Sequence, residues 1–254
     1  MSEAMSIESY LADGGKLSAP GNAPPRYRAE LLRLMASFVD SELAGAAGFA
    51  DMINAGPGIK ERIAASKIVL EKTDNADKVL QIMGEFGANT ARYANHHPWS
   101  DRLPRDAELA AKRAKGDMRL AVFNYPLSGW SDAVTMNLLM GLAVDEQLKD
   151  LGKVSYQPLA ETFRKIAPIE KRHTELALEG LEHLTKQGTP KSELQAAVDY
   201  WWPRVDQSFG AGKSARFDML KSWGLRHVEN QILRADWQAS AEVALNGLGL
   251  DVPQ

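Results

Sequence analysis

The chain has no cysteine among its 254 residues, and this absence excludes several kinds of site. Without thiols there can be no disulfides, thiolate zinc sites, iron–sulfur clusters or cysteine nucleophile. Net charge is also low, with 30 Lys and Arg against 33 Asp and Glu, so neither nucleic acid nor a membrane is an expected partner. No run approaches the roughly 20 apolar residues of a membrane span, and the N-terminus lacks a signal-peptide pattern. A cytoplasmic location is therefore expected.

Alternating β-branched runs are scarce as well, so almost no sheet is expected. Residues 1–25 contain several Gly and Pro residues and are expected to form a flexible lead. From Tyr27 onward, apolar residues recur at the helical period, and breaks fall at Gly- and Pro-containing segments. The pattern predicts helices over 26–54, 58–86, 130–150, 157–186, 191–208 and 212–247, with a shorter one near 106–116. We therefore predict an all-α fold in which residues 26–254 form a single domain.

The predicted helix over 157–186 carries two ionisable residues in the middle of its apolar face, Glu170 and His173. Burying an unpaired carboxylate is costly, so Glu170 needs a cation or a hydrogen-bond partner. Residues three apart are neighbours on a helix, and Glu-x-x-His is the arrangement that carboxylate-bridged di-metal bundles use. Because this spacing also occurs often by chance, it indicates a metal site only together with further inward-facing acids.

Two other helices supply such acids. Glu42 lies on the apolar stripe of helix 26–54, where an acid is either a ligand or stands at the rim of the bundle. In helix 130–150, Asp145 and Glu146 are both embedded in apolar neighbours. Periodicity alone does not decide which of these two faces the interior.

Helix 58–86 gives a less clear pattern. Glu71 and Asp74 are three apart, as Glu170 and His173 are. However, Lys67 precedes Glu71 by four residues and Lys78 follows Asp74 by four. Spacing alone therefore favours a solvent-facing ladder of i,i+4 ion pairs over a second pair of metal ligands.

The remaining unusual side chains carry weaker signals. His96 and His97 lie beside Pro98 in a loop-like region and are expected to be exposed. The aromatic run over 200–203 (Tyr-Trp-Trp-Pro) is more typical of core packing or a subunit contact than of a cofactor site.

Several ordered motifs over residues 26–225 resemble one known family. They are Phe123-Asn124-Tyr125-Pro126, Gly129-Trp130, Val144-Asp145, Ser155-Tyr156-Gln157-Pro158, Glu170-Lys171-Arg172-His173, Tyr200-Trp201-Trp202-Pro203 and Phe209-Gly210. Together they resemble the catalytic subunit of phenylacetyl-CoA epoxidase (ring 1,2-monooxygenase) complexes of bacterial phenylacetate catabolism. The resemblance implies a ferritin-like helical bundle with extra C-terminal helices.

The resemblance also implies a function. The family holds a non-haem di-iron centre, activates dioxygen, and inserts one oxygen atom into an aromatic ring carried as a CoA thioester. It works with a homologous, non-catalytic helical subunit and a separate electron-donating reductase, so a homo- or hetero-oligomer is expected. Carried over by position, the metal ligands are Glu42, Glu71, Asp74, Asp145, Glu170 and His173, and Lys67 matches a lysine near the centre. The candidates for binding the CoA phosphates are Lys112, Arg113, Lys115 and Arg119.

Departures from the family pattern leave an alternative open. The family has histidine where this chain has Asp74. A carboxylate can still ligate iron or manganese, but it adds negative charge to the site. Pro168, just before Glu170, is also expected to kink its helix. The alternative is therefore a metal-poor or metal-free homologue that serves as a structural or regulatory subunit.

Overall fold

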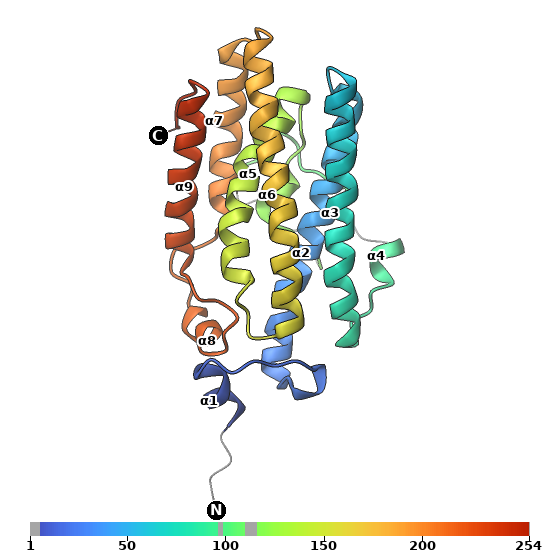
Figure 1. Ribbon diagram of the computed structural model, residues 1–254, viewed down its shortest axis with the longest axis vertical. Coiled ribbons are helices and arrows are strands. Elements are labelled where there is room, and N and C mark those ends of the chain that lie inside the picture. Colours follow the sequence, from blue (N-terminus) through green and yellow to red (C-terminus); the bar gives the residue numbers. More distant parts are fainter. Residues whose placement is uncertain (1–5, 96–98, 110–115, 254) are drawn as a thin grey trace, which may run out of the picture.

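The computed structural model describes residues 6–95, 99–109 and 116–253. In these residues the chain is all-α, as predicted, and contains no strand beyond an isolated bridge between Leu17 and Tyr156. Four long helices run side by side (Figure 1) and are consistent with a ferritin-like bundle. They are α2 (Pro25–Met52), α3 (Ile59–Glu85), α5 (Trp130–Leu151) and α6 (Gln157–Lys186).

Two further helices cover α5 on the side away from α3 (Figure 1), namely α7 (Lys191–Ser208) and α9 (Asn230–Gly247). Aromatic side chains make this contact. Trp237 of α9 is fully buried and donates its indole N–H to the carbonyl oxygen of Leu139 at 2.9 Å. Trp201 is buried too, and the Trp202 ring lies 4.7 Å from that of Trp237. The aromatic run therefore packs the core.

The ends of the long helices follow from local chemistry. Pro25 and Pro158 stand in the first turns of α2 and α6, where a missing N–H costs nothing. After α6, Gly188 takes a positive φ of 85°, which ends the helix in a conformation that side-chain-bearing residues disfavour. The described α6 continues through Pro168 without interruption.

Three boundaries differ from the predictions. The N-terminal lead contains α1 (Ile7–Ala12) and a 3₁₀ turn, η1 (Pro20–Asn22), because Leu11 and Leu17 are buried against the bundle. Residues 106–109 form turns and irregular structure rather than the predicted helix, whose remainder lies largely outside the described residues. The predicted helix over 212–247 is divided into α8 (Phe217–Ser222) and α9, since Gly224 follows α8 with a positive φ of 63°, which a continuing helix does not allow.

The smaller elements connect the bundle. They are η2 (Ile53–Ala55), α4 (Arg92–Asn95) and η3 (Ala121–Asn124). Among the described helices, none has both the length and the apolar character needed to cross a membrane.

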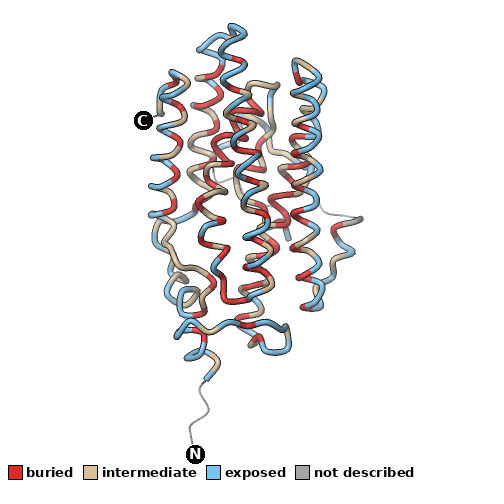
Figure 2. Tube along the Cα trace, in the orientation of Figure 1, coloured by how far each residue is buried: buried red, intermediate tan, exposed pale blue. Residues whose placement is uncertain are grey.

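The facing sides of the four long helices are buried along most of their length (Figure 2). One close approach depends on Gly141 of α5, where an added Cβ would lie 2.4 Å from the Thr174 hydroxyl of α6. Thr174 directly follows His173, so this contact brings α5 close to the polar residues of α6. The fold thus gathers those residues at the middle of the bundle.

Candidate functional site

A cluster of buried polar side chains interrupts the apolar interior of the bundle. Glu42 comes from α2, Lys72 and Asn75 come from α3, and Glu170 and His173 come from α6. All five are buried. Each stands where the apolar stripe of its helix would otherwise continue, so the helices bring together groups that are far apart in the sequence.

Lys72 is the centre of this cluster. Its Nζ donates to Glu170 Oε2 at 2.7 Å and to Glu42 Oε1 at 3.3 Å. Asn75, one turn further along α3, donates its amide N–H to Glu170 Oε1 at 2.9 Å. The cation that the buried carboxylates require is therefore an ammonium group of the chain itself.

The pKa values of Lys72, Glu170 and Glu42 indicate which of these three groups are charged. Burial opposes the charged form of Glu42, of Lys72 and of Glu170. Lys72 nevertheless holds the pKa of Glu170 well below its ordinary range, and the carboxyl groups of Glu170 and Glu42 raise the pKa of Lys72. Burial and the neighbouring Glu170 carboxylate raise the pKa of Glu42 to about 8, although Lys72 opposes this. At neutral pH, Lys72 and Glu170 form an ion pair, and Glu42 carries its own proton.

The side of α3 that faces the interior is not the side that carries Glu71 and Asp74, the two residues that the resemblance implies as metal ligands. The buried stripe of α3 contains Ala65, Ile68, Lys72, Asn75, Ala76, Val79, Ile82 and Met83. The inward pair with the spacing of Glu170 and His173 is therefore Lys72 and Asn75. Sequence reasoning missed both residues, although the apolar residues of α3 already define this face.

Glu71, Asp74 and Lys67 lie at the rim or on the surface. The Asp74 side chain is 59% exposed and pairs with Lys78 at 2.5 Å, and Lys67 Nζ lies 3.6 Å from Glu71 Oε1. The structure thus contains the ladder of i,i+4 ion pairs that spacing favours. Asp74 and Lys67 do not reach the interior cluster, which corrects the placement implied by the resemblance.

Glu71 has a second contact that links the ladder to the interior. Its Oε2 lies 2.7 Å from His173 Nε2, while His173 Nδ1 lies 3.4 Å from Glu170 Oε1. Histidines that bind metals commonly give their other ring N–H to a carboxylate in this way. Glu71 therefore contacts His173 at Nε2, the ring nitrogen on the side away from Glu170, and helps to orient the ring without facing the centre of the bundle.

On α5, neither acid joins the cluster directly. Glu146 is buried and pairs with Lys149 at 2.6 Å. Asp145 is half-buried, and burial raises its pKa to about 6, with Lys149 opposing the shift and Glu170 adding to it. Asp145 is thus the acid on α5 that is influenced by the charge of Glu170.

The basic residues expected to bind CoA phosphates give a mixed result. Lys112, Arg113 and Lys115 lie outside the described residues. Arg119 is buried, and its guanidinium donates to Asp117 Oδ2 at 2.7 Å and to the carbonyl oxygen of Asp101 at 2.9 Å. Internal acceptors hold the Arg119 guanidinium, so it does not lie on the surface where a CoA phosphate would bind. His96 and His97 also lie outside the described residues.

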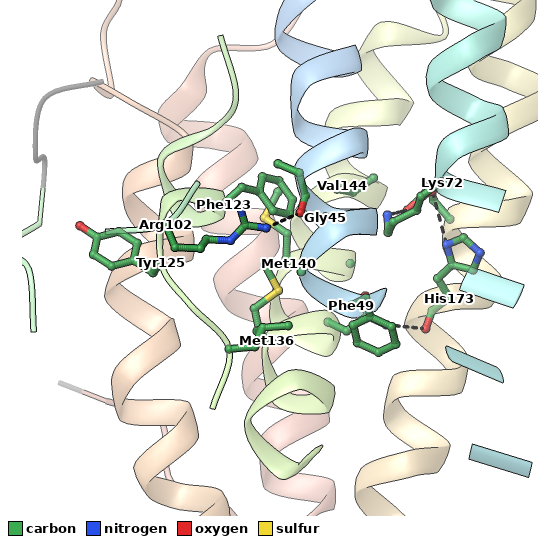
Figure 3. A pocket seen from close by; sticks show the side chains of 16 residues that line it. Gly45, Phe49, Lys72, Arg102, Phe123, Tyr125, Met136, Met140, Val144 and His173 are labelled. Carbon is green, nitrogen blue, oxygen red and sulfur yellow. Dashed lines mark hydrogen bonds and ion pairs between the residues drawn. The ribbon is translucent and has the colours of Figure 1, made fainter. Parts of the chain in front are cut away.

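Two cavities adjoin the cluster. The inner one, of about 30 Å³, has Lys72 and His173 at one end and Arg102 and Tyr125 at the other, with methionines and Phe123 between them (Figure 3). This volume accommodates about one water molecule. The second cavity, of 310 Å³, lies between α2, α5 and the C-terminal segment and is lined by Glu42 among many apolar residues.

A di-metal centre in a carboxylate bundle needs a Glu from each of two helices and a Glu-x-x-His pair from each of the other two. Here α6 supplies such a pair, but α3 supplies Lys72 and Asn75. An ammonium group has no lone pair to donate and repels a metal cation. In the described part of the chain, no group of three or more His, Asp or Glu residues is arranged to hold a metal. The interior does not fit a di-metal centre.

The protonated state of Glu42 leads to a pH prediction. Its pKa rises from an ordinary 4.5 to about 8 on folding, so between these values the native state holds a proton that the unfolded state lacks. The free energy of unfolding should therefore fall as pH rises from 6 to 8, by at most about 1.4 kcal/mol per pH unit. Urea titrations at both pH values measure this change. Glu42→Gln should remove it, and an equal fall in this variant would contradict the assignment.

The fold and the interior residues define this protein as an all-helical carboxylate bundle in which a lysine partners the central acids. The chain belongs to the phenylacetic acid catabolic protein family, whose model matches residues 5–254. A comparison with curated proteins gives no match. The family match covers nearly the whole chain and supports a role in phenylacetic acid catabolism, but it does not distinguish a catalytic from a non-catalytic subunit.

Proposed function

We propose that this chain is a non-catalytic helical subunit in phenylacetic acid catabolism, which associates with a homologous subunit that holds the metal. The observation that carries the proposal is the position of Lys72, whose Nζ lies between Glu42 and Glu170. The central acids already have their cation, and Asn75 takes the place of a second histidine ligand.

The size of the inner cavity supports the same proposal. Sites for small molecules usually have volumes of roughly 300–1,000 Å³, whereas the cavity beside Lys72 and His173 measures about 30 Å³. An aromatic acyl group does not fit there. On the side of Lys72 and His173, the cluster therefore joins α2, α3 and α6 and leaves no space for a substrate.

Metal content tests the proposal directly. The full chain, purified from cells supplied with iron and manganese, should contain well under one metal ion per chain by elemental analysis. It should also remain metal-free after anaerobic titration with Fe(II). A content near two ions per chain, lost in Glu170→Ala, would overturn the proposal.

The second candidate is the di-iron oxygenase that the resemblance implies, acting with dioxygen and a reductase on an aromatic acyl-CoA. Two observations favour it. Glu42 Oε2 and His173 Nδ1 are buried without a hydrogen-bond partner among the described residues, so neither atom is held by a protein donor or acceptor. The 310 Å³ cavity also joins Glu42 to an apolar space lined in addition by Arg33, Arg216 and Arg226. This candidate requires Lys72 to leave the cluster, which the metal titration would reveal.

A further inference from the structure

The outer face of α3 exposes three large apolar side chains in a row. Ile59, Ile63 and Leu70 are 78%, 62% and 69% exposed, and their spacings of four and seven residues place them on one face. α3 forms one edge of the bundle, opposite to α7 and α9 (Figure 1), and its outer side is exposed along much of its length (Figure 2). These side chains are among the few large hydrophobic residues that the described fold leaves in solvent.

Charge on the same face is divided by sign along the helix. The N-terminal half exposes Lys60 and Lys67, and the C-terminal half exposes Asp74 and Asp77. Glu71 and Lys78 are the exceptions, but both are only partly exposed, and they pair along the helix with Lys67 and Asp74. The exposed face of α3 is thus basic and apolar over its N-terminal half and acidic towards its end.

We propose that α3 pairs antiparallel with α3 of a second copy of this chain across a two-fold axis. A two-fold interface uses the same patch on both subunits and must therefore be self-complementary. Antiparallel pairing brings Lys60 and Lys67 of one copy to Asp74 and Asp77 of the other, twice. It also covers Ile63 and Leu70 of both copies, and antiparallel helix dipoles add to the attraction.

The division of charge favours a second copy over another occupant. A partner of a different sequence would need to carry the reversed pattern, whereas a second copy carries it by symmetry once the helix is turned around. The proposal does not depend on metal content, so its outcome is separate from that of the proposed function.

Charge reversal tests the pairing. Lys60→Glu/Lys67→Glu makes the whole face acidic, and Asp74→Lys/Asp77→Lys makes it basic. Each variant alone should be monomeric in sedimentation-velocity runs at concentrations where the unchanged full chain is dimeric. An equimolar mixture of the two should form a dimer again, because each copy then presents one sign to the other. Lys165→Glu/Lys186→Glu, on exposed positions of α6, is the control and should remain dimeric.

A second variant, which leaves the charges unchanged, tests the pairing even if the charge-reversed chains misfold. Ile63→Ser/Leu70→Ser keeps every charge and should weaken self-association by at least about tenfold, with the helical circular dichroism unchanged. An unchanged chain that is monomeric at all concentrations would overturn the proposal. So would reversed variants that stay dimeric alone, or a mixture of them that does not associate.

Discussion

Replacing Lys72 by methionine should destabilise the protein by about 3–5 kcal/mol, because it leaves buried carboxyl groups without their cation. For a chain of this size the loss corresponds to a fall in Tm of roughly 6–20 °C. Lys72 holds the pKa of Glu170 well below its ordinary range, so Glu170→Gln in the same chain should restore most of the lost stability. Thermal unfolding followed by circular dichroism measures all the variants.

The matched control is Lys78→Met, on the same helix. Lys78 pairs with Asp74 at the surface, and exposed ion pairs contribute about 0–1 kcal/mol. A fall in Tm for Lys72→Met no larger than that for Lys78→Met would show that the interior ion pair is not the structural element described above. Failure of Glu170→Gln to restore stability would mean that the loss comes from packing rather than from an unpaired charge.

The second large effect is a gain of metal binding. In Lys72→Glu/Asn75→His, α3 would present a Glu-x-x-His pair to Glu170 and His173, with Glu42 and Asp145 on the neighbouring helices. We expect the variant to bind up to about two Fe(II) or Mn(II) ions per chain, because this set of Glu and His ligands holds two ions in di-metal carboxylate bundles. Its interior acids then lack a protein cation, so its folding should depend on added metal. Elemental analysis and metal-dependent circular dichroism report the two effects.

Asp74→His separates the two possible registers of α3. If Glu71 and Asp74 faced the interior, this single change would complete a Glu-x-x-His pair and increase metal binding. Because the Asp74 side chain is 59% exposed and paired with Lys78, we expect no gain. Metal bound by Asp74→His but not by Lys72→Glu/Asn75→His would show that the described register is wrong.

Much of the architecture could be predicted because it depends on local pattern. Apolar periodicity and Gly- or Pro-containing breaks located the four long helices within a few residues. They did not reveal that Gly224, with a positive φ of 63°, separates α8 from α9. The all-α prediction and the resemblance to a phenylacetate catabolic family are confirmed. The predicted metal, substrate and partners remain predictions.

The central cluster shows where prediction from sequence ends. Glu42, Glu170 and His173 were found from the sequence because each interrupts a clear apolar stripe, and the structure brings all three together. On α3, acids at the expected spacing drew attention to Glu71 and Asp74. Consecutive residues of a helix differ by about 100° in direction, so a change of one position exchanges an interior pair for a rim pair.

The sequence by itself therefore determined the helices, the absence of thiol chemistry and the presence of buried acids that need a cation. Only the packing of α3 against α2 and α6 decided which cation they receive. It buries Lys72 and Asn75 against Glu42 and Glu170 and leaves Asp74 in solvent. The physical reason is that burial depends on which side of α3 meets its neighbours, and the spacing of acids along the chain does not contain that information.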